Sequence, residues 1–214
     1  MPGKILITSG PTRQYLDPVR YLSNGSSGQM GQRLAQSALD HGFDVVVVSG
    51  PVTVRYPKLC ELVSVVSTDE MLNATIDHFD SCCGMIAAAA PCDYAPAVVA
   101  KDKIKKDGQR IQIDLLETPD ILAKVGQLKR ANQWTVGFAL ETSDVHERAF
   151  QKLKKKKCDL IVINGPSAID SDHNEIEMMD ATGFIVSKFA GTKKAVANAI
   201  LQQVKKRLLG TGRF

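Results

Sequence analysis

Four consecutive valines within residues 44–49 are the feature that most constrains how this chain can fold. An unbroken apolar run of this length is typical of a parallel strand, because parallel sheets are covered by helices on both faces. The residues before it, from about 28 to 41, carry apolar side chains at helical spacing, and Gly42 follows them. This order predicts a helix that leads into a buried strand of an α/β sheet.

The same alternation of short apolar runs and helical stretches extends through the chain. The predicted strands are residues 5–8, 44–49, 62–66, 85–89, 134–140 and 160–164, and the predicted helices are residues 28–41, 67–79, 118–129, 144–157 and 192–209. Ser67 and Glu70 have capping-box spacing, and Thr118 and Pro119 are interpreted as a cap and a first helical residue. We therefore predict a single α/β domain over residues 1–214, with a Rossmann-like, mostly parallel sheet flanked by helices on both faces.

Two segments interrupt this alternation. Residues 178–186 contain a turn at 181–183 between two apolar pieces, which predicts an edge hairpin. Residues 90–110 carry prolines, lysines and a glycine, and an extended stretch is expected at 111–116, so we predict a long substrate flap at about residues 90–116. Ligands of such sheets bind beyond the carboxyl ends of the strands, and functional residues are therefore expected just after each strand.

Composition and charge limit the classes of partner. The formal net charge is +4, and basic residues cluster at 101–106, 154–157 and 205–207 without interleaved aromatic side chains. Such clusters suit an anionic small molecule, and no nucleic-acid partner is expected. Neither a signal-peptide pattern nor a bilayer-length apolar run is visible, which predicts a cytoplasmic protein without membrane contact. The five cysteines lack C-x-x-C spacing and are interpreted as reduced thiols, although Cys92 lies in the expected flap and leaves a reactive role open.

A glycine-rich loop precedes the first predicted helix. Gly25, Gly28 and Gly31 are separated by serines and other residues, and N–H groups of such a loop can approach a phosphate, although these loops are also common as plain structure. The spacing differs from a dinucleotide-binding turn, because the glycines begin well beyond the first strand and the second strand ends at Gly50 without an acidic residue. No tyrosine has a lysine four residues later, as a short-chain dehydrogenase would need. A Rossmann-type nucleotide-binding oxidoreductase is therefore kept only as an alternative.

Two further groups of residues could bind a nucleotide. Residues 87–96 place small side chains directly after a strand, and Asp93 could accept hydrogen bonds from a sugar or a base. The lysines at 103–106 could close over phosphates, or they could simply be a solvated basic loop. Lys152 and Lys156 lie one helical turn apart on one face, where the helix dipole alone would also favour lysine.

Taken together, these stretches resemble the phosphopantothenoylcysteine synthetase family, also known as phosphopantothenate–cysteine ligases. The matching segments are ITSGPTRQYLDPVRYLSNGSSGQMG, VVVVSGPV, AAAAPCDYAPA, KIKK, TPDILAKV, VGFALET and CDLIVIN. They follow the order of the family and nearly cover residues 4–188. The segments belong to the ligase module of a family in which that module can also be fused to a flavin-dependent decarboxylase, so the resemblance implies ligase activity alone.

The resemblance implies a two-step reaction in coenzyme A biosynthesis. The carboxylate of 4′-phosphopantothenate attacks the α-phosphate of CTP, which gives an acyl-cytidylate and pyrophosphate, and the amine of L-cysteine then displaces CMP. CTP is expected rather than ATP, and Mg²⁺ is expected as well, although its protein ligands are not assigned. A homodimer is also implied, in which the flap of one subunit lies near the site of the other. The apolar hairpin region is expected to suit the interface.

Site residues are carried over from the resemblance by motif position. Asn24 and Lys103 match the catalytic residues, with Asn24 acting on the acyl intermediate and Lys103 on formation of the cytidylate. The nucleotide-binding residues are expected to be Gly10, Ser26, Ser27, Gly28, Ala88, Ala89, Asp93, Pro119, Asp120, Ile121, Leu122, Phe138, Lys152 and Lys156.

The chain also departs from the family pattern. Gly25 stands where histidine is common, Gln29 where lysine is common, and Gly165 where aspartate is frequent, while Pro91-Cys92 is unusual before Asp93. These departures concern the contacts to the substrate phosphates and the choice of nucleotide. A non-catalytic homologue that serves as an interaction subunit is a second alternative, and retention of Asn24, Lys103, Lys152 and Lys156 argues against it.

Overall fold

An eight-stranded sheet forms the centre of the computed structural model, which describes residues 3–108, 110–140, 144–165 and 173–210. Its strands are β1 (Lys4–Ser9), β4 (Asp44–Ser49), β5 (Glu61–Ser64), β6 (Gly84–Ala87), β9 (Trp134–Leu140), β10 (Leu160–Asn164), β11 (His173–Asp180) and β12 (Ile185–Thr192). Their order in the sheet is β12-β11-β10-β9-β6-β1-β4-β5. The strands from β10 to β5 pair in parallel, and β11 and β12 are antiparallel to their neighbours. The mostly parallel sheet is confirmed.

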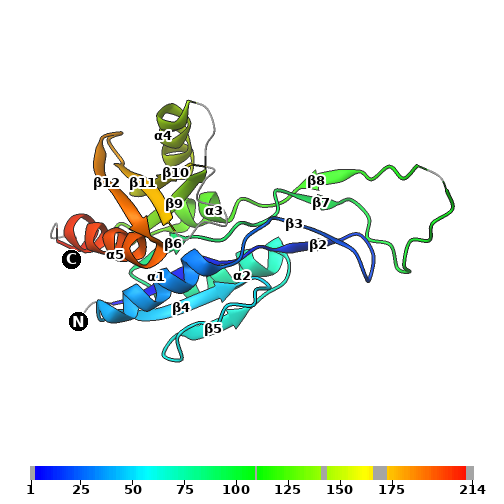
Figure 1. The fold of residues 1–214 in the computed structure, drawn as a ribbon, viewed down its shortest axis with the longest axis horizontal. Helices are drawn as coiled ribbons and strands as arrows, with labels where there is room; N and C mark the ends of the chain where they lie inside the picture. Colours follow the sequence, from blue (N-terminus) through cyan, green and yellow to red (C-terminus); the bar gives the residue numbers. More distant parts are fainter. Residues whose placement is uncertain (1–2, 109, 141–143, 166–172, 211–214) are drawn as a thin grey trace.

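Helices cover both faces of this sheet (Figure 1). They are α1 (Gln29–Asp40), α2 (Thr68–Phe79), α3 (Ile121–Leu128), α4 (Val145–Lys155) and α5 (Lys193–Val204), the last of which continues into a π-helical turn at Lys205–Leu209. All five predicted helices are present. Among the described residues, no helix has the length and apolar character needed to cross a bilayer.

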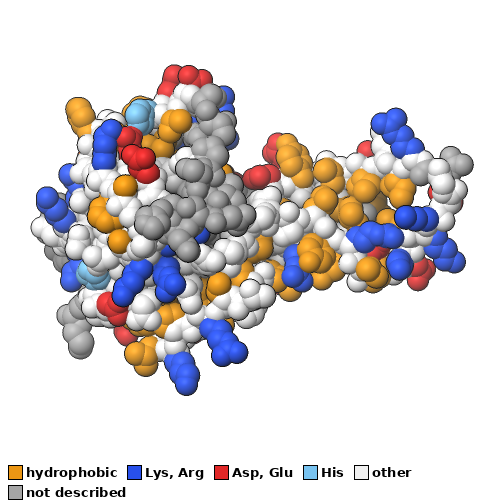
Figure 2. Space-filling view, viewed as in Figure 1, with side chains coloured by type: hydrophobic (Ala, Val, Ile, Leu, Met, Phe, Trp, Pro, Cys, Tyr) orange, Lys and Arg blue, Asp and Glu red, His pale blue; other side chains and the backbone are white. Residues whose placement is uncertain are grey.

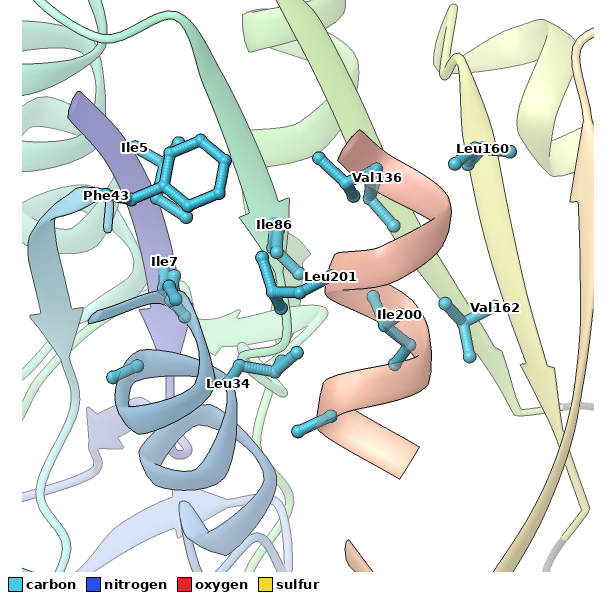
Figure 3. Close-up of a cluster of buried hydrophobic side chains, with 14 of the residues drawn as sticks. Ile5, Ile7, Leu34, Phe43, Ile86, Val136, Leu160, Val162, Ile200 and Leu201 are labelled. Carbon is cyan, nitrogen blue, oxygen red and sulfur yellow. The ribbon is translucent and has the colours of Figure 1, made fainter. Parts of the chain in front are cut away.

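The apolar side chains of each strand separate between the two faces of the sheet. In β1, Ile5 and Ile7 pack towards α1 and α5, whereas Leu6 packs with Met71 of α2 on the opposite face. Figure 3 shows the first of these clusters, in which Leu34 of α1 and Ile200 of α5 meet the strands. This alternation follows from the two-residue repeat of a strand, and burial on both faces explains the continuous valine run of β4.

Four short strands project from the sheet as an arm (Figure 1). β2 (Arg13–Tyr15) pairs with β3 (Tyr21–Ser23), and β7 (Tyr94–Pro96) pairs with β8 (Leu115–Glu117), both in antiparallel register. Residues 13–23 and the described part of 94–117 are called the arm below, and the main sheet with its helices is called the body. Each arm strand is three residues long, too short for a periodic pattern, so only the extended character near 111–116 was predicted.

A buried aspartate organises the outer part of the arm. Asp17 accepts hydrogen bonds from the backbone N–H groups of Val19, Arg20 and Ile104 and forms an ion pair with Arg20 at 2.7 Å. Burial alone would raise the pKa of Asp17, but these donors outweigh burial and hold the pKa at about 2. Arg20 also donates to the carbonyl of Ile104, so one carboxylate and its partner fix the flap against the β2–β3 hairpin.

Exposed apolar side chains are concentrated on the arm, as Figure 2 shows. Val98 is 82% exposed and Leu116 is 62% exposed. The edge hairpin differs, because Ile176, Met178 and Met179 of β11 are buried in the body. The prediction that this hairpin suits an interface stays a prediction, because Phe184 at its turn is 74% exposed while those side chains of β11 pack in the body.

Two local predictions also need correction. The cap of α3 is Asp120, whose carboxylate accepts from the N–H of Ala123, so the helix begins after Pro119 and Thr118 is not its cap. The edge hairpin is longer than residues 178–186, because β11 and β12 each span eight residues. By contrast, Ser67 accepts from the N–H of Glu70 at 3.1 Å, which confirms the predicted cap of α2.

Candidate active site

A cavity of about 650 Å³ lies at the carboxyl ends of β1, β6, β9 and β10. This volume is in the range of small-molecule sites, and the position is the one expected for a parallel α/β sheet. The predicted site residues that line it are Asn24, Ser26, Ser27, Gly28, Ala88, Ala89, Asp93, Pro119, Asp120, Ile121, Leu122, Phe138, Lys152 and Lys156. Segments far apart in the sequence therefore converge as the sequence predicts.

The N-terminus of α1 opens directly into the cavity. Its cap residue is Gly28, which has φ +75° and no side chain to satisfy the first N–H groups, and the first turn holds no acidic residue. Uncapped N–H groups at a helix N-terminus favour an anion. Gly31 brings α1 against β1, because a Cβ at this position would lie 2.0 Å from the Oγ of Ser9. Gly31 thus allows α1 to pack closely against β1, and Gly28 leaves the first N–H groups of α1 available to an anion.

Asn24 is held by the loop on the opposite side of the cavity. Its side-chain Nδ2 donates to the carbonyl of Pro91 at 2.8 Å and to the carbonyl of Ala90 at 3.3 Å. Because both acceptors are carbonyl oxygens, the amide NH₂ must face them, and the side-chain Oδ1 is directed away. Ser23, the neighbour of Asn24, donates to the carbonyl of Thr12 at 2.9 Å. The Asn24 side chain is therefore positioned from two sides.

A buried polar network holds the loop that receives Asn24. The hydroxyl of Thr12 accepts from the N–H of Cys92 and lies 2.8 Å from the hydroxyl of Thr68. Thr68 and Thr118 both donate to the carbonyl of Cys92, and Gln14 donates to Thr68. We call Thr12, Gln14, Thr68, Cys92 and Thr118 the threonine network. It fixes the backbone between Pro91 and Asp93 in the floor of the cavity.

The thiol of Cys92 does not have the environment of a nucleophile. Its residue is 5% exposed, and burial raises the pKa of the thiol above its ordinary value. A thiol with a raised pKa stays protonated at neutral pH, whereas reactive cysteines need a thiolate. The structure therefore favours a packing role for Cys92 over the reactive role that the sequence left open.

The wall formed by α3 and α4 carries two of the three lysines in the described lining of the cavity. Lys152 and Lys156 both line it, and Lys156 pairs with the carboxylate of Asp120 at 3.0 Å. The same carboxylate caps α3, so Asp120 positions both the lysine and the helix. Asp93 lines the cavity from the floor and is exposed within it.

A family model described as the DNA/pantothenate metabolism flavoprotein C-terminal domain matches residues 2–208. The chain belongs to this family. It is 40% identical over 182 residues to the "Coenzyme A biosynthesis bifunctional protein CoaBC" of Haemophilus influenzae, covering 84% of this chain and 46% of that protein. The protein of the same name from Vibrio vulnificus is 40% identical over 207 residues, covering 94% of this chain and 51% of its own length. The chain thus spans about half the length of these curated relatives.

A solved structure supports the same assignment. The crystal structure of the C-terminal domain of a protein named CoaBC is 37% identical in sequence, with a TM-score of 0.84, and the match covers 97% of this chain and 96% of that one. The fold of the family and the fold of this chain are therefore the same over nearly their whole length.

Two predicted site residues of this family member lie outside the described lining of the cavity, namely Gly10 and Lys103. Gly10 has φ +73°, and a Cβ there would lie 2.6 Å from Val52, so this glycine permits the turn after β1. Lys103 lies on the arm beside Ile104, whose N–H is bound to Asp17. Within one chain, the arm does not bring Lys103 to the other site residues.

The cavity also contains residues that were not predicted as site residues, among them Asn164, Asn174 and Lys193. Asn164 ends β10, Asn174 lies in β11, and Lys193 begins α5. Lys193 donates to the side chain of Gln29 at 3.3 Å across the N-terminus of α1. The only sequence signal was the position of Asn164 at a strand end, because the pairing that brings β11 and α5 to this edge is non-local.

The described residues offer no preformed metal cage. No group of three or more His, Cys, Asp or Glu side chains that could hold a metal ion occurs among them.

Proposed function

We propose that this chain catalyses the condensation of 4′-phosphopantothenate with L-cysteine through an acyl-nucleotidylate. The observation that carries the proposal is the cavity itself, which joins Asn24, Asp93, the open N-terminus of α1 and the lysine pair of α4 at one edge of the sheet. The relatives named as bifunctional proteins of coenzyme A biosynthesis support the same chemistry.

The first step needs charge stabilisation more than a nucleophilic side chain, because the substrate carboxylate itself attacks the α-phosphate. The N–H groups at the start of α1 and the amines of Lys152 and Lys156 would bind the triphosphate and stabilise the pyrophosphate as it leaves. A cavity that encloses both reactants also holds them in the orientation for attack.

In the second step, Asn24 would have a specific role. When the amine of cysteine attacks, negative charge develops on the acyl oxygen, and an amide N–H can stabilise it. The bond from Asn24 to Ala90 is the longer of its two, at 3.3 Å, so the acyl oxygen would replace that acceptor. The 2.8 Å bond to Pro91 would continue to hold the side chain in place.

CTP is the proposed nucleotide and Mg²⁺ the proposed ion, both on the basis of the sequence resemblance. Mg²⁺ would neutralise phosphate oxygens when bound. Asp93 is the cavity carboxylate best placed to contact it or its water shell, because Asp120 is already engaged with Lys156 and the cap of α3.

A homodimer is proposed to complete the site. Lys103 lies on the arm outside the cavity of its own chain, and the arm exposes Val98, Val99, Ile111 and Leu116. An exposed apolar surface of this kind is typical of an interaction site. The arm of a second copy would bury these side chains and bring its Lys103 to the triphosphate.

Pyrophosphate release tests the activity directly. The purified protein should release pyrophosphate with 4′-phosphopantothenate and CTP, and should form amide only when cysteine is added, with a lower rate for ATP. Absence of nucleotide-dependent turnover of phosphopantothenate with both nucleotides would refute the ligase and favour a non-catalytic homologue.

Co-expression of two inactive variants tests the dimer. Lys103→Gln should slow nucleotidylate formation most, and Asn24→Asp should block amide formation. If arms are exchanged, one site of each mixed dimer combines intact residues from both chains, and about a quarter of wild-type activity should return. Activity no higher than the sum of the separate variants would show that each arm serves its own chain.

A further inference from the structure

The C-terminal end of α3 carries a lysine whose side chain is largely buried. Lys129 directly follows the helix, and its side chain is 16% exposed. Its ammonium group donates to the carbonyl of Lys157 at 2.7 Å and to the hydroxyl of Thr135 at 3.5 Å, and it forms an ion pair with Asp159. A lysine ammonium has three N–H groups, and these three acceptors account for all of them. Lys129 is therefore directed away from the cavity, and it is not among the described residues that line it.

The carbonyl that Lys129 binds belongs to the turn between α4 and β10. Lys157 has φ +51° in this turn, and only one other described non-glycine residue has a positive φ. The N–H of Lys157 donates to the carbonyl of Lys154 at 3.1 Å, and the N–H of Cys158 donates to the carbonyl of Leu153 at 2.9 Å, which is the Schellman pattern of a helix end. Glycine is the usual residue at the left-handed position of this pattern, because a side chain is strained there. The bond from Lys129 thus holds a backbone conformation that a lysine does not favour by itself.

The residue before this turn is Lys156, which lines the cavity. Helix α3 contacts Lys156 at two further points. Its cap residue, Asp120, pairs with the ammonium group of Lys156 at 3.0 Å. Gly126 packs against the backbone of Lys156 so closely that a Cβ at Gly126 would lie 2.0 Å from the carbonyl oxygen of Lys156. One short helix therefore determines both where the side chain of Lys156 begins and in which direction it extends.

Asp159 connects the same turn to the sheet. Its carboxylate accepts from the N–H of Thr135 at 2.8 Å, and its own N–H donates to the carbonyl of Thr135 at 2.9 Å. The side chain of Asp159 is 14% exposed, and a carboxylate this buried is stable only with a cation or several donors. The ion pair with Lys129 supplies the cation, so it joins the end of α3, the start of β9 and the turn after α4.

We propose that Lys129 is a positioning residue that holds Lys156 towards the phosphates of the bound nucleotide, an inference that rests on the proposed nucleotide-dependent function. A lysine side chain has many rotamers, and fixing its backbone reduces the entropy that is lost when its ammonium group binds a phosphate. Lys129 touches no substrate in this arrangement and acts only through the turn. Its removal should therefore weaken contacts to phosphate, and only when Lys156 is present.

Nucleotide binding in a double-mutant cycle tests this dependence without requiring turnover. Kd for CTP is measured in the wild-type protein, in Lys129→Met, in Lys156→Met and in the double variant. Each single variant should bind CTP about tenfold more weakly, which is the effect of losing one charged hydrogen bond. The double variant should bind no more weakly than Lys156→Met alone, because the two residues act as a unit. Losses that multiply to about a hundredfold would show that Lys129 acts independently of Lys156, and the proposal would be overturned.

Arg130 provides a matched control at the same end of α3. It forms its ion pair with Asp80 at 2.6 Å, so Arg130→Met removes the same charge from the same place while the bonds of Lys129 to the turn remain. Kd for CTP should be unchanged in Arg130→Met, and a loss equal to that of Lys129→Met would assign the effect to general charge. Cytidine, which carries no phosphate, should bind wild-type protein and Lys129→Met equally in a competition experiment. A parallel loss of cytidine binding would assign the effect to general damage of the fold.

A milder variant tests the same ion pair if Lys129→Met is too unstable for binding measurements. Asp159→Asn removes the charge but keeps the size of the side chain and an oxygen for the N–H of Thr135. It should weaken CTP binding about threefold in the wild-type background and leave it unchanged in Lys156→Met. If wild-type protein binds CTP and both Lys129→Met and Asp159→Asn bind it equally well, the positioning role is wrong and the ligase stands. If the wild-type protein binds neither CTP nor ATP, the proposed function fails and this inference fails with it.

Discussion

The backbone N–H and C=O groups of the body and those of the arm find their hydrogen-bond partners in different ways. In the body, β1 and β4 pair over six residues each, and their apolar side chains are buried on both faces. In the arm, the strands are only three residues long. The carboxylate of Asp17 adds to their pairing by accepting hydrogen bonds from backbone N–H groups of two segments. The body is therefore stabilised by burial, and the arm by a few directed polar contacts.

This difference separates two parts of the proposed function. The body presents a cavity whose lining is already in place, with Asn24 held by carbonyl groups and Lys156 by Asp120. The arm presents Lys103 and a row of exposed apolar side chains that find no partner surface within the described part of the chain. Body variants should thus change chemistry or stability in isolation, whereas arm variants should act through the second subunit.

Asn24→Asp should have the largest effect on the reaction. The carboxylate would face the carbonyl oxygens of Pro91 and Ala90 without a proton to donate, and the amide N–H groups would be lost. Amide formation should fall about 10²- to 10³-fold, whereas pyrophosphate release should persist. Rapid-quench measurement of the acyl-nucleotidylate and the amide checks this. Full amide synthesis in the variant would remove Asn24 from the second step.

Gly31→Ala should be the most damaging change to the packing of the body. The added Cβ would lie 2.0 Å from the Oγ of Ser9, which already hydrogen-bonds to Tyr56 and to the carbonyl of Gly28. Moving α1 away from β1 should lower the free energy of unfolding by about 1–3 kcal/mol. Urea unfolding followed by the fluorescence of the single tryptophan, Trp134, measures the change.

Gly25→Ala provides the matched control for that substitution. Gly25 lies in the loop that precedes α1, whereas Gly31 lies inside the helix, and within the described part of the chain nothing comes within 4 Å of a Cβ added at Gly25. Its effect on the free energy of unfolding should stay within about 0.5 kcal/mol. Equal losses in the two alanine variants would show that contact with Ser9 does not decide the cost.

The sequence predicted the body well because its signals are local. The valine run of β4, the spacing of α1 and the Ser67 cap each specify one element by themselves, and parallel topology then brings the strand ends together. Most of the residues chosen from the resemblance line one cavity for this reason. Their positions were predictable even where their roles stay proposals.

The remaining features depend on contacts between distant segments. Asp17 binds Ile104 across 87 residues, Lys193 reaches Gln29 across 164, and neither pair has a sequence pattern. The three-residue strands of the arm are too short to show alternation. The cap of α3 was predicted at Thr118 but is Asp120. The hydroxyl of Thr118 instead donates to the carbonyl of Cys92, and the carboxylate of Asp120 accepts from the N–H of Ala123.

Thr12→Val should test whether the threonine network positions Asn24. The change leaves the buried N–H of Cys92 without its acceptor, which should lower the free energy of unfolding by about 1–2 kcal/mol. Because the same loop holds Asn24, amide formation should fall about tenfold more than pyrophosphate release. Thr12→Ser keeps the hydroxyl and should restore the normal ratio of amide to pyrophosphate. A valine variant that is less stable but keeps that ratio would limit the network to a structural role.

On acidification, the arm should lose its folded structure at a higher pH than the body. This change should have the smallest effect of all on the free energy of unfolding of the whole protein. The pKa of Asp17 is lowered to about 2 in the folded protein from an ordinary value of 3.8, so its stabilising contribution is complete above about pH 4 and is lost as pH falls towards 2. Three of the four tyrosines, Tyr15, Tyr21 and Tyr94, lie in the arm, whereas Tyr56 and Trp134 lie in the body, so the tyrosine signal reports mainly the arm and the tryptophan signal reports the body. The tyrosine signal should change first on acidification, and Asp17→Asn should show the altered tyrosine signal already at pH 7 with tryptophan unchanged. If both signals changed together at one pH in both proteins, the arm and the body would be one cooperative unit, and the contrast between them would not hold.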